Sequence, residues 1–141
     1  MRVSIHGKPE FGSTFSRGDG AFDLVVPAGQ HTVTMAAPAF LTAQRQVLAV
    51  KGRFQHLEDD VVLLRVDEKS TAVTLPAGGW HEASVHSDDS GARAVRLFIP
   101  PGTTAVADMP DGTTRPLSTV TLRVTEFTVG TRGPQAMPAS L

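Results

Sequence analysis

The chain has 141 residues, a formal net charge of −1, no cysteine and no tyrosine. A charge this small creates no long-range field that would attract nucleic acid or an anionic membrane. The absence of cysteine excludes disulfides and thiolate metal sites. No stretch approaches about 18 consecutive apolar residues, so we expect no membrane insertion. Thirteen glycines, ten prolines and the lack of a long helical stripe predict an all-β protein.

Turn residues and alternating side chains predict the strands of the first half. Asp19-Gly20 tolerates positive φ, so we expect a tight hairpin there. Pro27-Ala28-Gly29 predicts the next turn. Phe22, Leu24 and Val26 share one face at period two, which indicates a half-buried strand. The expected strands are 2–6, 13–16, 21–26, 31–36, 44–50 and 61–64, with 13–16 paired to 21–26.

Three features predict the organisation of the chain. Val61–Leu64 is apolar on both faces, which is typical of a central strand covered on two sides. Gln44–Val50 has mixed polarity and is expected near an edge. Arg65–Ser70 is charged and shows no pattern, so the boundary is expected there. This gives one module at residues 1–68 and a second β-rich module at residues 69–141.

The second half predicts further short strands. Ser87–Gly91 and Asp111-Gly112 indicate turns. Residues 92–99 form the best strand of this half, and Val120, Leu122 and Val124 alternate with polar residues. The remaining strand candidates are 71–75 and 81–86. The alternation of apolar and polar residues stops at residue 130, where glycine and proline residues predict a loop. We therefore expect the second module to be incomplete.

No residue pattern indicates catalysis, a cofactor or a metal. The five histidines are scattered, and a spacing of five places His81 and His86 on opposite faces of a strand. Asp88-Asp89 lacks the alternating carboxylates of a calcium loop. No nucleophile, base and orienting acid can be assigned from spacing. We therefore expect a protein that is not an enzyme.

Exposed aromatic residues are the candidate contact sites. Phe11, Phe40 and Trp80 are expected to offer docking side chains for a partner. Trp80 is the only tryptophan and follows a turn, so it is either a packing anchor or the rim of a site. With His81 and the Asp88-Asp89 turn it would form the rim of a carbohydrate- or peptide-binding module. A third class is an enzyme accessory or inhibitor-like domain.

Several blocks carry a resemblance to known families. An Asp-Gly-x-aromatic hairpin at 18–24 (GDGAFDL), a turn at 27–29 (PAG) and an apolar strand at 31–33 (HTV) resemble the carboxypeptidase regulatory-like domain. That resemblance implies a small transthyretin-like β-sandwich without catalysis for the first module. For the whole chain we expect two small antiparallel β-sandwich modules. Longer blocks are similar to the segment that precedes the repeats in bacterial RHS (YD-repeat) proteins. These blocks are 7–14, 40–47, 98–105 and 124–138.

The RHS resemblance implies a piece of a large bacterial surface or secreted protein. Its expected partners are other domains of the parent protein or a surface partner, and open sheet edges would allow a homo-oligomer. RHS repeats form a β-cocoon and often carry a toxin, but this chain has no tyrosine-aspartate repeat. We therefore assign neither the cocoon nor a toxin activity to any residue of this chain. We expect a non-catalytic structural and interaction region, found outside the cell or at its surface.

Overall fold

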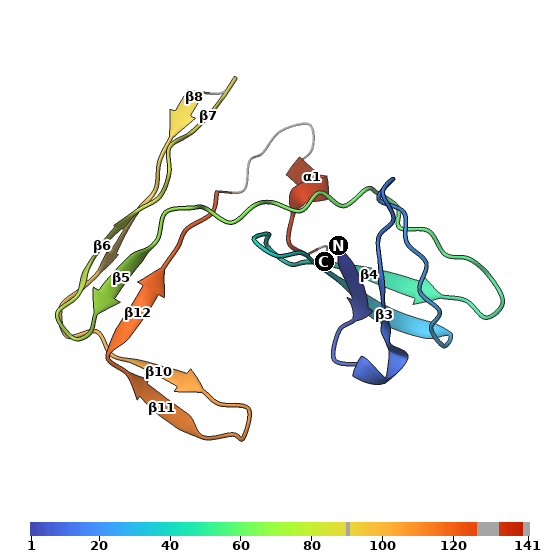
Figure 1. Cartoon of the computed structure of the whole chain (residues 1–141), viewed down its shortest axis with the longest axis horizontal. Helices are drawn as coiled ribbons and strands as arrows, with labels where there is room; N and C mark the ends of the chain where they lie inside the picture. Colours follow the sequence, from blue (N-terminus) through green and yellow to red (C-terminus); the bar gives the residue numbers. More distant parts are fainter. Residues whose placement is uncertain (90, 127–132, 140–141) are drawn as a thin grey trace. The chain divides into compact units, whose positions relative to one another are not determined.

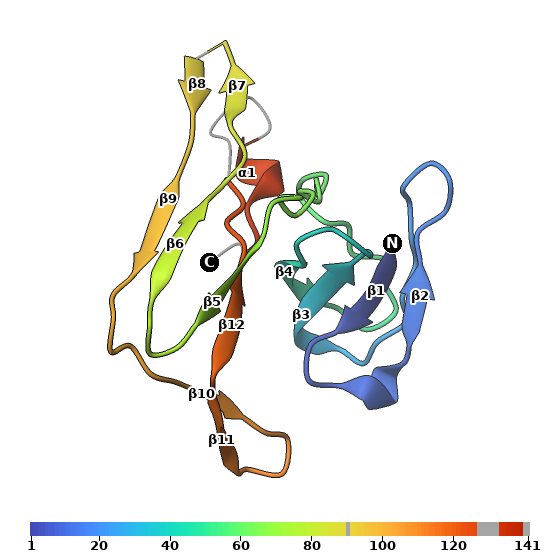
Figure 2. The same ribbon diagram turned by 60° about the vertical axis from the view of Figure 1, so that its left-hand side comes forward.

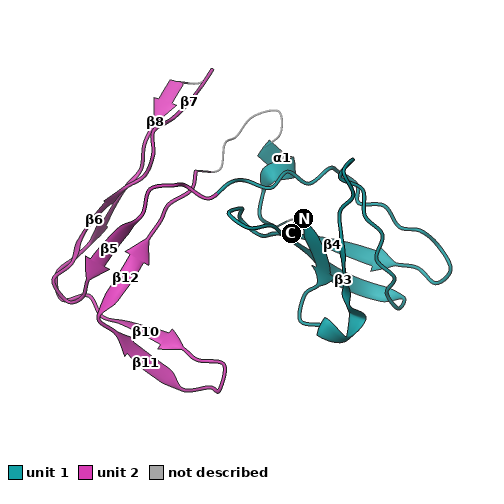
Figure 3. Cartoon of the chain, viewed as in Figure 1, with its two compact units in different colours: residues 1–65, 127–141 teal, residues 66–126 magenta. Residues whose placement is uncertain are grey.

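The computed structural model describes residues 1–89, 91–126 and 133–139 (Figure 1). The chain divides into two compact units: unit 1 is Met1–Arg65 with residues 127–141, and unit 2 is Val66–Glu126 (Figure 3). Both units are built from antiparallel strands, so the predicted all-β class is confirmed. The division differs from the predicted modules 1–68 and 69–141, because the described C-terminal residues group with the first unit.

Unit 1 contains one four-stranded antiparallel sheet in the order β2-β1-β3-β4 (Figure 2). Its strands are β1 (Arg2–Ile5), β2 (Ser13–Phe15), β3 (Gly29–Ala36) and β4 (Ala43–Ala49). A single 3₁₀ turn, Pro9–Phe11, links the first two strands. The predicted strands at 2–6, 31–36 and 44–50 are confirmed, and β4 lies last in the strand order, as its mixed polarity indicated.

The core of unit 1 lies on one face of this sheet. Val3, Ile5, Val33 and Met35 are buried, because alternate residues of paired strands point to the same side. Half-buried apolar side chains from two extended segments cover them. These side chains are Phe22, Leu24 and Val26 from one segment and Leu57, Val61 and Leu63 from the other. A sheet with an extended layer packed on it thus forms the sandwich.

The predicted pairing of 13–16 with 21–26 is wrong. The turn itself is present, since Arg17 N–H donates to Ala21 O at 2.8 Å and Asp19 Oδ1 accepts from Ala21 N–H at 2.9 Å. β2, however, pairs with β1, and residues 21–26 form no strand. The apolar face of this segment is buried by lying on the sheet, which the alternating pattern alone does not distinguish from lying beside it.

The predicted central strand Val61–Leu64 is also wrong. These four residues are half-buried and belong to no ladder. Leu64 O accepts from Leu41 N–H at 2.8 Å, and Val62 N–H donates to Gln135 O at 3.0 Å. The segment is apolar on both faces because the sheet contacts one side and other segments of the same unit cover part of the other.

The C-terminal segment is attached to unit 1 by Arg45. The predicted loop contains a short helix, α1 (Gly133–Ala136), while residues 130–132 lie outside the described residues. Arg45 is 9% exposed, and its guanidinium donates to Met137 O at 2.9 Å and Gln135 O at 2.9 Å. Gln44 N–H adds a bond to Pro138 O at 2.6 Å. One buried cation therefore joins β4 to backbone carbonyls about ninety positions later in the chain.

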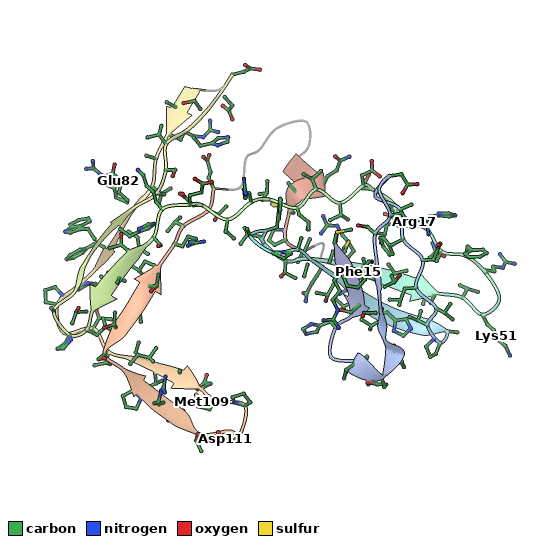
Figure 4. All side chains as sticks on the ribbon, in the orientation of Figure 1. Phe15, Arg17, Lys51, Glu82, Met109 and Asp111 are labelled. Atoms are coloured by element: carbon green, nitrogen blue, oxygen red, sulfur yellow. The ribbon has the colours of Figure 1, made fainter. Side chains whose placement is uncertain are left out.

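Unit 2 consists of two-stranded antiparallel pairs. The pairs are β5 (Thr71–Thr74) with β12 (Thr119–Leu122), β6 (Gly79–Glu82) with β9 (Arg96–Ile99), β7 (His86–Asp88) with β8 (Gly91–Arg93), and β10 (Ala105–Asp108) with β11 (Thr114–Leu117). Val120 and Leu122 are half-buried, as their alternation predicted. The turn predicted at Asp111-Gly112 joins β10 to β11, where Figure 4 labels Met109 and Asp111.

The strand predicted at 92–99 is divided into β8 and β9. Figure 2 shows β6 leading into β7 and β8 returning into β9, so the four form one long hairpin. Trp80 pairs with Phe98, whereas His86 pairs with Arg93, which shifts the register by one residue between the two ladders. An extra residue on one side is a β-bulge, and it ends the regular alternation.

Asp67 ties three segments of unit 2 together. Its carboxylate accepts from Ser84 Oγ at 2.6 Å, Ser84 N–H at 2.7 Å and Lys69 N–H at 2.9 Å. Its own N–H donates to Thr125 Oγ1 at 3.0 Å. The bonds from Ser84, followed by that from Lys69, lower the pKa of Asp67 from 3.8 to about 2.

Replacing Arg45 by alanine should release the C-terminal segment. The change removes charge-assisted hydrogen bonds to carbonyls. We expect the free energy of local unfolding of this segment to fall by about 2 kcal/mol. Amide exchange at Gln44 and Val62 should then accelerate roughly 30-fold, measured by NMR in the full chain. Arg53→Ala, at an exposed loop position, is the control. Unchanged exchange at both amides in Arg45→Ala would contradict the role of Arg45 in holding the C-terminal segment.

Replacing Asp67 by asparagine should destabilise unit 2 in a pH-dependent way. A folded-state pKa below the unfolded value stabilises the protein above about pH 3.8, and this contribution disappears as the pH falls through about 2. Urea unfolding followed by circular dichroism should show wild type more stable than Asp67→Asn at pH 6, and the difference should shrink towards pH 2. Asp60→Asn, in an exposed loop, should show no such convergence. A difference independent of pH would contradict the role of the carboxylate.

Candidate functional site

The outer face of the β6–β9 ribbon gathers two aromatic and two charged side chains. Trp80 lies opposite Phe98, and Glu82 lies opposite Arg96. Positions two residues apart on a strand share a face, so these four side chains lie on one side of the ribbon. The rings of Trp80 and Phe98 stack with centroids 4.3 Å apart and planes inclined at 30°. Arg96 Nε donates to Glu82 Oε2 at 2.9 Å.

A shallow cavity of about 240 Å³ opens at this place, lined by Trp80, His81, Glu82 and Arg96. Trp80 is 62% exposed and Phe98 is 44% exposed, so most of the indole surface faces solvent despite the stacking. Figure 4 shows Glu82 projecting from the ribbon. The volume lies below the roughly 300–1,000 Å³ of sites for drug-sized molecules.

Gly78 sets the entry of the chain into β6. Its φ is +78°, and a Cβ atom there would lie 2.5 Å from Ile99 O. Only glycine accommodates both the left-handed backbone and the close approach. This close approach lies next to the pairing of Gly79 with Ile99, the first pair of the ladder in which Trp80 lies opposite Phe98.

His81 lies on the opposite face of β6 and is buried, with 1% of its surface exposed. Its Nδ1 is 3.0 Å from Thr71 Oγ1. Its Nε2 is a buried atom with no hydrogen-bond partner among the described residues. Sequence reasoning expected His81 at the rim beside Trp80, whereas the structure places it beneath the strand.

Phe11 and Phe40 belong to unit 1 and do not join this site. Phe11 is half-buried against the core and meets the His31 ring edge-on at 5.6 Å. Phe40 is 40% exposed and forms an isolated bridge with Arg65. Of the four predicted contact residues, only Trp80 presents its side chain on the outer face of the ribbon, because the side chain of His81 is buried on the opposite face.

The Asp88-Asp89 turn, expected as part of the rim, lies at the far end of the long hairpin. Arg93 donates to Asp88 Oδ2 at 2.6 Å and to Glu126 Oε1 at 2.6 Å. These two carboxylates raise the pKa of the Arg93 guanidinium above its usual value. Asp88 is thus engaged in a structural ion pair, and Ser90 lies outside the described residues.

Sequence reasoning missed Glu82, Arg96 and Phe98 as members of the site. The signal was present, because Trp80 and Phe98 are equally far from Asp89, the centre of the predicted turn. Folding the chain about that point pairs the two aromatic residues. Residues 81–86 are a strand candidate in the sequence, but their own pattern assigns them no partner.

Metal-ligating and membrane-spanning features are not found in the part of the chain that the structure describes. Within residues 1–89, 91–126 and 133–139, no three histidine, aspartate or glutamate side chains are grouped closely enough to hold a metal ion. Over the same ranges, no helix has the length and hydropathy needed to cross a membrane.

Comparison with known proteins supports the fold of the first unit. Residues 1–63 match the family model described as the teneurin TTR-like domain, where TTR denotes transthyretin. This match covers β1 to β4 and both extended segments that bury the core, and it confirms the transthyretin-like expectation for this part. No curated protein and no solved structure matches the chain.

Proposed function

We propose that the chain is a non-catalytic structural and interaction region of a larger bacterial surface or secreted protein of the RHS type. The match of residues 1–63 to a teneurin TTR-like domain supports an interaction module that does no chemistry. The similarity of four sequence blocks to the region ahead of RHS repeats supports the larger parent. Such a parent places the chain outside the cell or at its surface.

The observation that carries this proposal is the small core of unit 2. Among its described residues, the buried apolar side chains are Val73, Leu75 and Ala83. Many large apolar side chains of the same unit face solvent. They are Trp80, Val85, Val95, Leu97, Phe98, Val106 and Met109. Exposed apolar surface of this extent is typical of a region that another protein segment covers.

The strand edges of unit 2 offer a second means of contact. Its ladders are two-stranded, so the described strands have outer edges that no ladder occupies. Unpaired N–H and C=O groups along an edge pair readily with an added strand. Other domains of the parent protein, a surface partner or a second copy of the chain would each fit, and their apolar side chains would cover the exposed set.

A second candidate function is the binding of carbohydrate or peptide at Trp80. The exposed stacked pair of Trp80 and Phe98 beside the cavity favours it. Aromatic faces next to hydrogen-bonding groups are the usual means by which proteins bind small ligands of mixed polarity.

Hydrogen exchange tests the docking role. In the complete parent protein, amides near Val85, Val95 and Val106 should exchange at least tenfold more slowly than in the isolated chain, because a covering segment excludes water from them. Mass spectrometry of both samples measures the ratio. Amides of β1 and β3, which form the core of unit 1, are the internal control and should exchange at similar rates in both. Equal exchange across unit 2 would refute docking.

A further inference from the structure

The outer face of the β6–β9 ribbon combines two kinds of surface within one cavity. The stacked rings of Trp80 and Phe98 offer an apolar face, and the ion pair of Glu82 with Arg96 offers polar groups beside it. A ligand that satisfies both must be a ring with apolar C–H bonds on one face and hydrogen-bonding groups at its edge. A pyranose of the glucose configuration has this chemistry, because its ring hydroxyls are equatorial and its axial C–H bonds form a flat apolar patch.

The charge of the site selects a neutral ligand. Glu82 and Arg96 neutralise each other across the ribbon at 2.9 Å. Their hydrogen bond uses one N–H and one carboxylate oxygen, which leaves further guanidinium donors and the second oxygen. Both side chains are largely exposed, so these groups are available to solvent or to a ligand. A neighbouring donor and acceptor suit a pair of adjacent hydroxyls, since each hydroxyl both donates and accepts.

His81 takes no part in contacting a ligand stacked on Trp80. Its side chain lies on the opposite face of β6, is 1% exposed and contacts Thr71 Oγ1 through Nδ1. The polar side-chain groups that a ligand on the outer face can reach are therefore those of Glu82 and Arg96.

We propose that the cavity at Trp80, lined also by His81, Glu82 and Arg96, binds one neutral pyranose ring, which stacks on the indole and directs its hydroxyls to the charged pair. This inference rests on the second candidate function, ligand binding at Trp80, and is independent of the docking role of unit 2. A single ring makes few contacts, so the affinity for a monosaccharide is in the millimolar range.

The single tryptophan makes the test direct. Methyl β-D-glucopyranoside added to the full chain should change the fluorescence of Trp80 saturably, because stacking removes the indole from water. Saturation-transfer NMR should show the strongest signal at the axial protons of the ring. Trp80→Ala should abolish the NMR signal, and Arg96→Gln, which leaves both rings in place, should weaken binding at least fivefold. Phe54→Ala removes an exposed aromatic of unit 1 and is the matched control, with unchanged binding.

The alternatives have distinct outcomes. A proline-rich peptide that binds in a Trp80-dependent way, with no response to the glucoside, would overturn the sugar assignment while supporting ligand binding at this site. The absence of any saturable response to glucoside and peptide would overturn both. Tighter binding of a charged sugar such as glucuronate than of the neutral glucoside would refute the selection for a neutral ring. Circular dichroism of each variant shows whether it is folded.

Discussion

The in-and-out alternation of side chains along short extended segments is the constraint on which both units depend. In unit 1 it places Val3, Ile5, Val33 and Met35 on one face of the sheet, where they are buried. In the β6–β9 ribbon the same rule places Trp80 outward and the adjacent His81 inward. A slip of one residue would exchange these faces, so register decides which side chains form a core and which form a site.

Much of this could be predicted from the sequence, because alternation is a local property. The strands at β1, β3, β4, β5 and β12 and the turn at Asp111-Gly112 follow from the residues within each segment. The segment with which a strand pairs depends on residues that are distant in the sequence. Residues 21–26 and Val61–Leu64 have the apolar pattern of strands, yet they lie on the sheet as a covering layer. An apolar face is buried equally well in both arrangements, so the pattern does not choose between them.

The candidate site shows the same division between local and distant information. The sequence singles out Trp80 as the only tryptophan and as a residue that follows a turn. The candidate site also requires Phe98, Glu82 and Arg96. These residues join it only when the hairpin is folded about Asp89. The burial of His81 could not be predicted from the sequence either, because it depends on β5 and the hydroxyl of Thr71 lying beneath β6. Arg45 is a further case, since its carbonyl partners are distant in the sequence.

The return of residues 133–139 to unit 1 has a consequence for synthesis on the ribosome. Unit 2 stands between the two parts of unit 1 in the chain, so it is translated before the first unit has all its contacts. Until Gln135 and Met137 emerge, the nascent chain cannot give the Arg45 guanidinium these two acceptors, and β4 cannot form its bridge to Ala139. The early part of the chain therefore completes its hydrogen bonds only after the whole of unit 2 has been synthesised.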